Sequence, residues 1–519
     1  MKPTVVATTM AKRGFFAPAL PHRLARQLTS MRTWGFGLAG ELRQAAARSP
    51  KSVAVVDDDR RLTYAELVAE SDAVTSVLSA RGIGPGDRIG LLARNHVGTV
   101  SAILGANALG ADLVLLNTGL GADALAHLVT EQDLRLLVHD DEFSSLVGDL
   151  GVGRLSERDL ARELHLLGPV PGPPPPVEAG RTVILTSGTT GMPRAATRRT
   201  PGGLGPMVSM LDRIPLNNRD RVLVSAPLFH TWGYAALQLG LGVRATLVLQ
   251  RRFDPVAAHT ALVRYRCHAM FAVPILIERM LAAADAGDLP RPPELRVVAV
   301  SGSSLSTGFA PRFMDRYGEV LYSLYGSTEA SWICIADPRQ LRRDPATAGT
   351  PPLGTRVEIL DADLAPVRDG VTGRIFVGND LVFEGYSDGG GVTSHEGMIA
   401  TGDLGHRAGG LFYVDGRGDD MVVSGGENVH PAAVQRIIEE SPEVREVCVT
   451  GVPDAEFGQR LAAFVVLEEE ASLSGEDVRA LVRSRLARHA VPRDVHFVEA
   501  LPRNAAGKVL ARELVAPDA

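Results

Sequence analysis

The sequence contains little lysine, cysteine or aromatic side chain. Lysine supplies four of the 54 Lys and Arg residues, there are three cysteines, and Phe, Trp and Tyr make up 5% of the chain. The cysteines at 267, 334 and 448 are far apart and form no C-x-x-C pair, which excludes a disulfide framework and a cysteine zinc site and fits a reducing compartment. No basic block is interleaved with aromatic residues, so no nucleic-acid partner is expected.

Long apolar runs are also missing. The longest, residues 97–117, is interrupted by Asn107 and Asp112, so it predicts a buried helix leading into a strand and not a membrane span. The apolar stretch after Lys2 is too short for a signal peptide, and we expect a cytoplasmic protein. Residues 14–40 mix aromatic residues with arginine. They fit either a helix on a membrane surface, which would give peripheral membrane contact, or an arm packed on its own domain, which we favour.

The remaining composition is that of a globular protein with more than one domain. The chain has 519 residues, of which 45% are hydrophobic and 22% charged, with a net charge of −6. Strand-like segments at 53–56, 88–92 and 113–116 alternate with helices, one of which begins after Thr63 as its N-cap. A similar alternation covers 180–340, short strands follow over 345–415, and a mixed segment ends the chain.

This order predicts an α/β protein. A large N-terminal domain would hold two βα-layered subdomains and a small β subdomain, followed by a small mobile α+β C-terminal domain. We expect an N-terminal arm over 1–45, the large domain over 46–419 and the small domain over 420–519. The oligomeric state stays open, and a homodimer is one of the assemblies compatible with the sequence.

The clearest local motif is a strand that runs into a loop of glycine and hydroxyl residues, over residues 183–194. Glycine lets the backbone approach an anion, which hydroxyl and N–H groups can then surround. The loop lacks the G-K-[ST] of a Walker motif. A phosphate-binding loop is the interpretation we favour, and a Ser/Thr-rich surface turn is the alternative. Its candidate residues are Thr186, Ser187, Gly188, Thr189, Thr190, Gly191 and Arg194.

Several further motifs follow this loop in a fixed order: Tyr-Gly-Ser-Thr-Glu at 325–329, Thr-Gly-Asp at 401–403, Gly-Arg at 416–417 with Asp420, Ser-Gly-Gly-Glu-Asn at 424–428, and a segment around Lys508. Together they resemble the adenylate-forming superfamily, which includes acyl-CoA synthetases, adenylation domains of peptide synthetases and beetle luciferases. The resemblance extends from about residue 50 to the end and favours the fatty-acid–CoA ligase branch. It implies that a carboxylate attacks the α-phosphate of ATP, and that a thiol, usually of coenzyme A, then displaces AMP.

The resemblance also implies roles for the residues of the large domain. The loop over 186–194 would hold the β- and γ-phosphates, although Arg194 and Ala195 stand where relatives usually have lysine and glycine. Thr328 would contact the α-phosphate, and Glu329 would bind Mg2+ as an oxygen ligand. Tyr325 would stack on the adenine ring. The adenine slot would be formed by Ser301, Gly302, Ser303, Ser323, Leu324, Tyr325 and Gly326.

The remaining implied roles concern the ribose and the small domain. Asp403, supported by Arg417, would accept hydrogen bonds from the ribose hydroxyls. Asp420 would be the hinge between the domains. Lys508 would reach the α-phosphate during adenylation and withdraw when the small domain rotates. The thiol tunnel would then be lined by Ser424, Gly425 and Gly426.

Lys508 is the one lysine beyond residue 51. An ammonium is a compact point charge on a thin stem, whereas a guanidinium is a broad planar fork. A side chain that must enter a narrow slot and leave again is better served by lysine, so the composition independently singles out this position.

The acid is suggested by residues 226–233, where His230 follows Phe229. Amino-acid-activating relatives commonly have an aspartate at this position, so an amino-acid substrate is disfavoured and His230 would lie near the reacting carboxylate. The small apolar residues over 234–242 could line an acyl tunnel or pack as an ordinary helix. We expect a medium- or long-chain fatty acid, with an aryl acid as the alternative. A carrier-protein thiol as acceptor and a non-catalytic binder are the other hypotheses.

Overall fold

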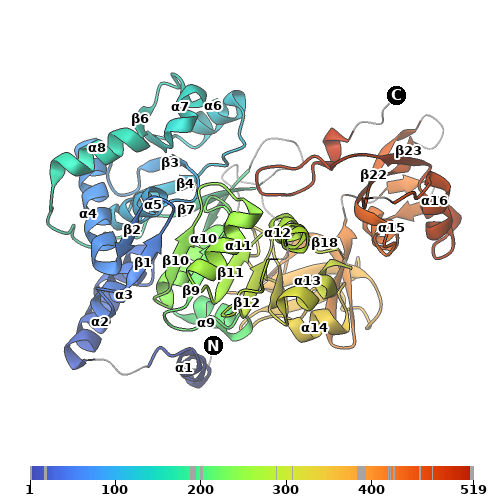
Figure 1. Ribbon diagram of the computed structural model, residues 1–519, viewed down its shortest axis with the longest axis horizontal. Coiled ribbons are helices and arrows are strands. Elements are labelled where there is room, and N and C mark those ends of the chain that lie inside the picture. Colours follow the sequence, from blue (N-terminus) through green and yellow to red (C-terminus); the bar gives the residue numbers. More distant parts are fainter. Residues whose placement is uncertain are drawn as a thin grey trace.

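The computed structural model describes residues 3–16, 20–186, 194–198, 203–287, 289–306, 308–382, 393–418, 420, 422–424, 427–454, 458–469 and 471–514. Two sheets with helices on both faces form the large N-terminal part, and a smaller α+β part follows to one side of it (Figure 1). The predicted α/β fold class is confirmed.

The first sheet has six strands in the order β6-β5-β3-β4-β7-β8, parallel except for the antiparallel edge strand β8. The expected strand at 88–92 is present, and the one expected at 113–116 begins one residue earlier, at Asp112. The strands are β3 (Arg88–Leu92), β4 (Asp112–Leu115), β5 (Leu136–His139), β6 (Gly153–Ser156), β7 (Thr182–Thr186) and β8 (Arg194–Arg198).

The second sheet has eight strands in the order β14-β13-β12-β11-β9-β10-β1-β2, with a parallel centre and two antiparallel edge strands. Its central strands are short apolar runs buried on both faces, as expected for parallel strands. The strands are β1 (Val53–Val56), β2 (Arg61–Thr63), β9 (Arg221–Val224), β10 (Thr246–Leu249), β11 (Ala269–Ala272), β12 (Val297–Val300), β13 (Leu321–Tyr325) and β14 (Cys334–Ala336).

The alternation of side chains along a strand divides the interior into separate cores. Val222 and Val224 of β9 face the core shared with the first sheet, whereas Leu223 faces a second core. The shared core is filled by α3 (Leu38–Arg48), α4 (Tyr64–Ala80), α5 (Val97–Leu109), α9 (Gly205–Arg213) and α10 (Thr231–Gly242). The second core is closed by α11 (Pro255–Arg264), α12 (Pro274–Ala286), α13 (Phe309–Tyr317) and α14 (Pro338–Arg343). The outer face of the first sheet carries α6 (Ala122–Glu131) and α7 (Ser144–Val147), and α8 (Glu157–Leu167) packs against α4.

Helix α4 begins as its sequence predicts. The Thr63 hydroxyl accepts a hydrogen bond from the Glu66 backbone N–H, and the Glu66 carboxylate accepts one from the Thr63 backbone N–H. This reciprocal pair satisfies two of the N–H groups that a helix start leaves without partners.

A small antiparallel sheet follows the two large sheets, as the pattern over 345–415 predicts. Its strands are β15 (Arg356–Leu360), β16 (Gly373–Gly378), β17 (Ser394–His395), β18 (Met398–Ala408) and β19 (Leu411–Arg417). The chain leaves this sheet after Arg417 and enters the sheet of the C-terminal part at Val422.

The C-terminal part has one mixed sheet with two helices. It comprises β20 (Val422–Ser424), β21 (Glu427–Val429), β22 (Val444–Asp454), β23 (Gly458–Leu467), β24 (Asp494–Phe497), α15 (Pro431–Glu439) and α16 (Gly475–Arg483). A hairpin closed by the bridge between Arg503 and Val509 reaches back from this part toward α12 (Figure 1).

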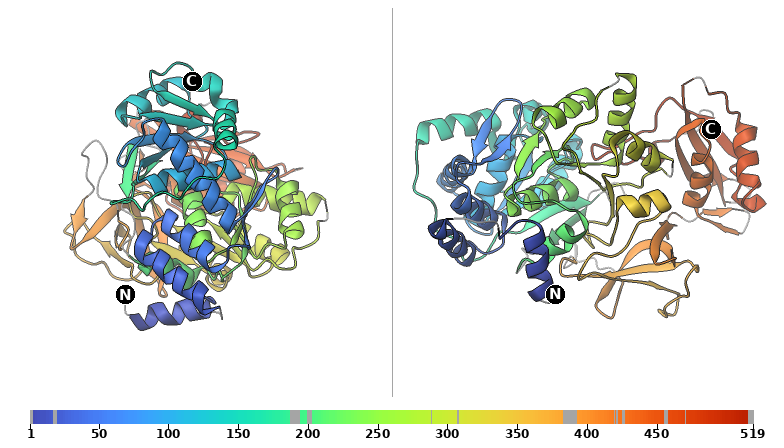
Figure 2. Two further views of the ribbon diagram at one scale, coloured as in Figure 1. Left: turned by 90° about the vertical axis from the view of Figure 1, so that its left-hand side faces the viewer. Right: turned by 60° about the horizontal axis from the view of Figure 1, so that its bottom comes forward.

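The N-terminal residues form α1 (Pro3–Lys12) and α2 (Pro21–Trp34), which lie at the outer edge of the molecule (Figure 2). Helix α2 packs on α3 and leaves Leu24 and Leu28 exposed. The boundary expected at residue 45 falls inside α3, which packs on α5 and α10 as part of the large domain. Within the described residues, every helix is too short or too polar to cross a bilayer. Peripheral membrane contact stays a prediction.

Candidate active site

The candidate residues of the large domain gather at one edge of the eight-stranded sheet. Parallel strands have their carboxyl ends at the same edge, where open α/β sheets bind ligands. His230 lies beyond the end of β9, and Val273 directly follows β11. The end of β12 brings Ser301, Gly302 and Ser303 to this edge, and β13 brings Ser323, Leu324 and Tyr325.

Gly302 connects two of these groups. It is exposed, with φ +108°, a conformation that side chains rarely adopt. A Cβ built on Gly302 would lie 3.7 Å from His230 Cε1 and 3.5 Å from Val273 Cγ1. The loop after β12 therefore lies beside the histidine, and glycine is needed in it for the positive φ.

His230 is positioned by a local cap and a distant asparagine. Its Nδ1 accepts a hydrogen bond from the Trp232 backbone N–H at 3.3 Å, so His230 is the N-cap of α10. The buried Asn95 side chain donates to the carbonyls of Val224 and Ala226 at 3.2 and 2.9 Å and accepts from the Leu228 N–H at 2.8 Å. Sequence analysis missed Asn95, because its partners are more than 120 residues away.

The turn after β13 carries Thr328 and Glu329, both half-buried. Gly326 is required there, since a Cβ would lie 2.1 Å from the Ser331 carbonyl oxygen. Asn379, also missed from sequence, donates hydrogen bonds to the carbonyls of Ala330 and Trp332 at 2.8 and 3.1 Å. The close approach of Gly326 to Ser331 and the hydrogen bonds from Asn379 thus fix the backbone of the turn that carries Thr328 and Glu329.

Tyr325, Asp403 and Arg417 form one cluster. The Tyr325 hydroxyl donates a hydrogen bond to Asp403 Oδ2 at 2.5 Å, and Arg417 Nη1 lies 3.9 Å from Asp403 Oδ1. Burial and the neighbouring Asp403 carboxylate raise the pKa of Tyr325 well above its usual value, so its hydroxyl stays protonated. Asp403 and Arg417 face each other on the paired strands β18 and β19. The carboxylate is therefore oriented by a phenol and a guanidinium.

The hairpin that carries Lys508 is docked on the large domain. A Cβ on Gly507 would lie 2.7 Å from Ile275 Cγ2 and 3.3 Å from Val273 Cγ2. A Cβ on Gly119 would lie 3.0 Å from Ala505 Cβ. Val273 also borders Gly302, which borders His230, so the hairpin tip joins the edge where the other candidates meet. Lys508 itself is exposed.

The hairpin has an ordered internal structure. The Asn504 carboxamide oxygen accepts hydrogen bonds from the backbone N–H groups of Ala506 and Lys508 at 3.0 and 2.9 Å. Arg503 donates to the Gly507 carbonyl at 2.8 Å and pairs with Glu446 at 2.6 Å. Lys508 is thus presented on a tight turn that is fixed to the C-terminal sheet.

Some candidates lie outside the described residues: Ser187, Gly188, Thr189, Thr190, Gly191, Gly425 and Gly426. Of Thr186, Arg194 and Ser424 only the backbone is described, at the end of β7, the start of β8 and the end of β20. Asp420 is exposed between β19 and β20. Their ligand roles, like those of the other candidates, stay predictions.

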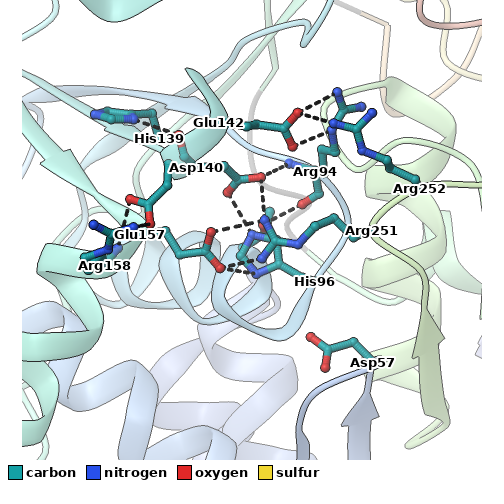
Figure 3. Close-up of polar contacts among 12 residues, drawn as sticks. Asp57, Arg94, His96, His139, Asp140, Glu142, Glu157, Arg158, Arg251 and Arg252 are labelled. Atoms are coloured by element: carbon teal, nitrogen blue, oxygen red, sulfur yellow. Dashed lines mark hydrogen bonds and ion pairs between the residues drawn. The ribbon is translucent and has the colours of Figure 1, made fainter. Parts of the chain in front are cut away.

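A separate polar cluster lies between the two large sheets (Figure 3). His96 Nε2 is 2.8 Å from Asp140 Oδ1, and Glu157 Oε1 is 3.7 Å from His96 Nδ1. The His, Asp and Glu donor atoms lie within 4.8 Å of one another, a spacing that suits a metal ion. However, the Arg251 guanidinium pairs with both Asp140 and Glu157. Since a cation already fills this position, we interpret the cluster as an ion-pair network joining the sheets.

Comparisons with known proteins agree with this geometry. The AMP-binding enzyme family matches residues 42–387, and the AMP-binding enzyme C-terminal domain matches residues 433–508. The chain belongs to the AMP-binding enzyme family. It is 32% identical to a feruloyl-CoA synthase of an Amycolatopsis species, over 90% of this chain and 96% of the relative. It is 28% identical to a long-chain-fatty-acid–CoA ligase of Mycobacterium tuberculosis, over 90% and 96% of the two chains.

Among solved structures, o-succinylbenzoate CoA synthetase from Bacillus subtilis, in complex with its acyl-adenylate, superposes with a TM-score of 0.81. The two sequences are 26% identical, and the match covers 92% of this chain and 98% of the other. The expected membership of the CoA-ligase branch of the adenylate-forming superfamily is thereby confirmed, and the chain is an AMP-forming acid–thiol ligase.

Proposed function

We propose that this AMP-binding enzyme joins a carboxylic acid to coenzyme A in two steps. In the first, a carboxylate oxygen bonds to the α-phosphorus of ATP and the bond to pyrophosphate breaks. In the second, the coenzyme A sulfur bonds to the acyl carbon, AMP leaves, and the thiol proton passes to solvent. The observation that carries the proposal is the docking of the Lys508 hairpin beside His230, Gly302 and the β11 end.

The site is suited to the first step because it gathers groups that complement anions. Lys508 would stabilise charge that develops on the α-phosphate, and Thr328 would donate a hydrogen bond to it. Asp403 would hold the ribose, since its carboxylate is already oriented by Tyr325 and Arg417. The loop over 186–194 would hold the outer phosphates.

Magnesium fits the half-buried Glu329 carboxylate, an oxygen donor on the fixed turn after β13. When bound there with ATP, the ion would neutralise phosphate charge. Glu329 would keep this ion beside the phosphates while Thr328 faces the α-phosphate.

Two classes of acid are candidates. A medium- or long-chain fatty acid is the prediction from sequence. A compact aryl acid is the second candidate, favoured because the apolar pocket beside α10 has a volume of only about 40 Å³. A water needs roughly 10–15 Å³ on the same measure, so this pocket suits the end of a short acid better than a long alkyl chain.

The test is AMP release with ATP, Mg2+ and coenzyme A across acids from acetate to stearate, with benzoate and phenylpropanoate. The proposal predicts turnover that requires both the acid and coenzyme A. Pyrophosphate exchange without thioester formation would point instead to a carrier-protein thiol, which a phosphopantetheinylated carrier would reveal. Absence of exchange with every acid would contradict the proposal and favour a binding protein.

A further inference from the structure

Glu41 is a carboxylic acid buried in apolar surroundings. It lies in the first turn of α3 and only 7% of its surface is exposed. The Gln238 side chain of α10 lines the same pocket, and among the described residues Glu41 Oε2 has no hydrogen-bond partner. Burial raises the pKa of Glu41 well above its usual value, which favours the protonated carboxyl, a group that can both donate and accept a hydrogen bond.

This carboxyl forms part of the wall of the pocket beside α10. Glu41 and Gln238 are the two ionisable or amide side chains of the wall, and the Trp332 indole N–H is already bonded to Thr355. The rest of the wall is mainly apolar, including Phe36, Leu204, Met207, Leu239, Trp332 and Leu381. A buried polar group without a partner is costly, and such groups in native proteins ordinarily have a reason.

The pocket lies along the helix that begins at His230. Helix α10 begins at the His230 cap, and Ala235, Gln238 and Leu239 farther along it line the pocket. At 1.5 Å per residue, Gln238 lies roughly 12 Å along the helix from His230. Trp332 belongs to the turn that carries Thr328 and Glu329, and Leu381 accepts a hydrogen bond from Ser331 of this turn. The pocket therefore lies where the far end of an activated acid would extend.

We infer that Glu41 and Gln238 recognise a hydroxyl group at the end of the acid opposite its carboxylate. This inference rests on the proposed function and names its substrate class: a hydroxylated acid of about 12 Å or less from carboxylate to hydroxyl. The substrate hydroxyl oxygen accepts a hydrogen bond from the Glu41 O–H or from the Gln238 amide N–H. The substrate O–H in turn donates a hydrogen bond to the carbonyl oxygen of Glu41 or Gln238. The remaining apolar wall holds the alkyl or aryl body of the acid.

The size of the preference follows from the unpaired oxygen. A site that hydrogen-bonds a substrate hydroxyl can discriminate against the analogue lacking this hydroxyl by about 10⁴-fold or more in kcat/KM. Here the Gln238 amide lines the same pocket and offers the carboxyl a nearby alternative partner when the analogue is bound, so less is lost with the analogue. We expect a preference of roughly tenfold to a hundredfold in kcat/KM, well below that upper range.

The experiment compares matched acids with and without the terminal hydroxyl. The aliphatic arm uses ω-hydroxydecanoate, decanoate and ω-aminodecanoate, and the aromatic arm uses para-hydroxyphenylpropanoate and phenylpropanoate. The measurements are kcat/KM for AMP release with coenzyme A and binding of each acid by calorimetry. The arm with the larger hydroxyl preference identifies the body of the acid. A higher rate with ω-aminodecanoate than with ω-hydroxydecanoate would overturn the inference in favour of an ionised Glu41.

Two variants link the preference to the carboxyl. In Glu41→Leu the hydroxyl preference should vanish in both kcat/KM and calorimetry, while thermal stability rises because an unpaired buried polar group is removed. In Glu41→Gln, whose carboxamide still offers both a donor and an acceptor, an intermediate preference should remain. Met210→Leu, which changes the same wall without changing its polarity, should keep the wild-type ratio.

The outcomes separate this inference from the proposed function. If acids are turned over but the ratio is near one, or if Glu41→Leu leaves a large ratio unchanged, Glu41 only ties α3 to α10 and the inference is wrong. If the matched acids and the wider panel all give no AMP with coenzyme A, the proposed function itself fails.

Discussion

The docked hairpin makes a steric prediction at Gly507. Alanine there places a Cβ 2.7 Å from Ile275 Cγ2 and 3.3 Å from Val273 Cγ2, and a β-branched side chain cannot readily move aside. Overpacking of this kind destabilises by typically 1–3 kcal/mol. If adenylation requires the docked hairpin, Gly507→Ala should slow it by about 5- to 150-fold, at 1.36 kcal/mol for each factor of ten.

The assay separates the two half-reactions. Pyrophosphate exchange reports adenylation, and single-turnover thioester formation from purified acyl-adenylate reports the second step, which Gly507→Ala should spare. Since Gly507 has φ +83°, the control is Gly370→Ala, which has φ +84° and no atom within 4 Å of the added Cβ. Combining Gly507→Ala with Ile275→Ala should restore most of the exchange lost relative to Ile275→Ala alone. Equal loss in both half-reactions, or no recovery in the double variant, would refute the reasoning.

Two further predictions concern docking and stability. Burial and the nearby Glu446 and Glu439 raise the pKa of Glu278 on α12 to about 7, against the opposing effect of Arg503. Between about pH 4.5 and 7, Glu278 therefore takes up a proton when the C-terminal part docks. Docking is then weakened as the pH rises through this window. The decline in adenylation from pH 6 to 8 should therefore be smaller in Glu278→Gln, and an identical decline would contradict this. Asn95→Ala leaves three backbone groups without their hydrogen-bond partner. At roughly 1 kcal/mol for each group, the unfolding free energy measured by urea titration should fall by about 3 kcal/mol. An unchanged midpoint would show that other groups hold the loop before His230.

Much of the fold could be predicted because it depends on local patterns. The apolar run at 53–56 and the Thr63 cap are found as expected, since strand periodicity and capping involve neighbours in sequence. The order of the motifs also indicated the family. Tyr325 and Asp403 were assigned to one nucleotide site, and the structure brings them into hydrogen-bond contact.

The supporting residues could not be predicted in the same way. Asn95 acts on carbonyls 129 and 131 positions away, and Asn379 acts on a turn 47 to 49 positions away. Glu41 looks like an ordinary helical glutamate in the sequence. Its burial depends on how α3 packs against α10, nearly 200 residues later. No local pattern carries such information, because it arises from tertiary packing.

Lys508 is assigned to adenylation and not to thiol transfer, and this assignment is the central prediction. The decisive measurement is the rate of each half-reaction in Lys508→Ala, with Lys51→Ala as a control for removal of an exposed ammonium. We predict that pyrophosphate exchange falls by several orders of magnitude while thioester formation from supplied acyl-adenylate stays near the wild-type rate. Parallel loss of both half-reactions, or exchange that persists in Lys508→Ala, would contradict it.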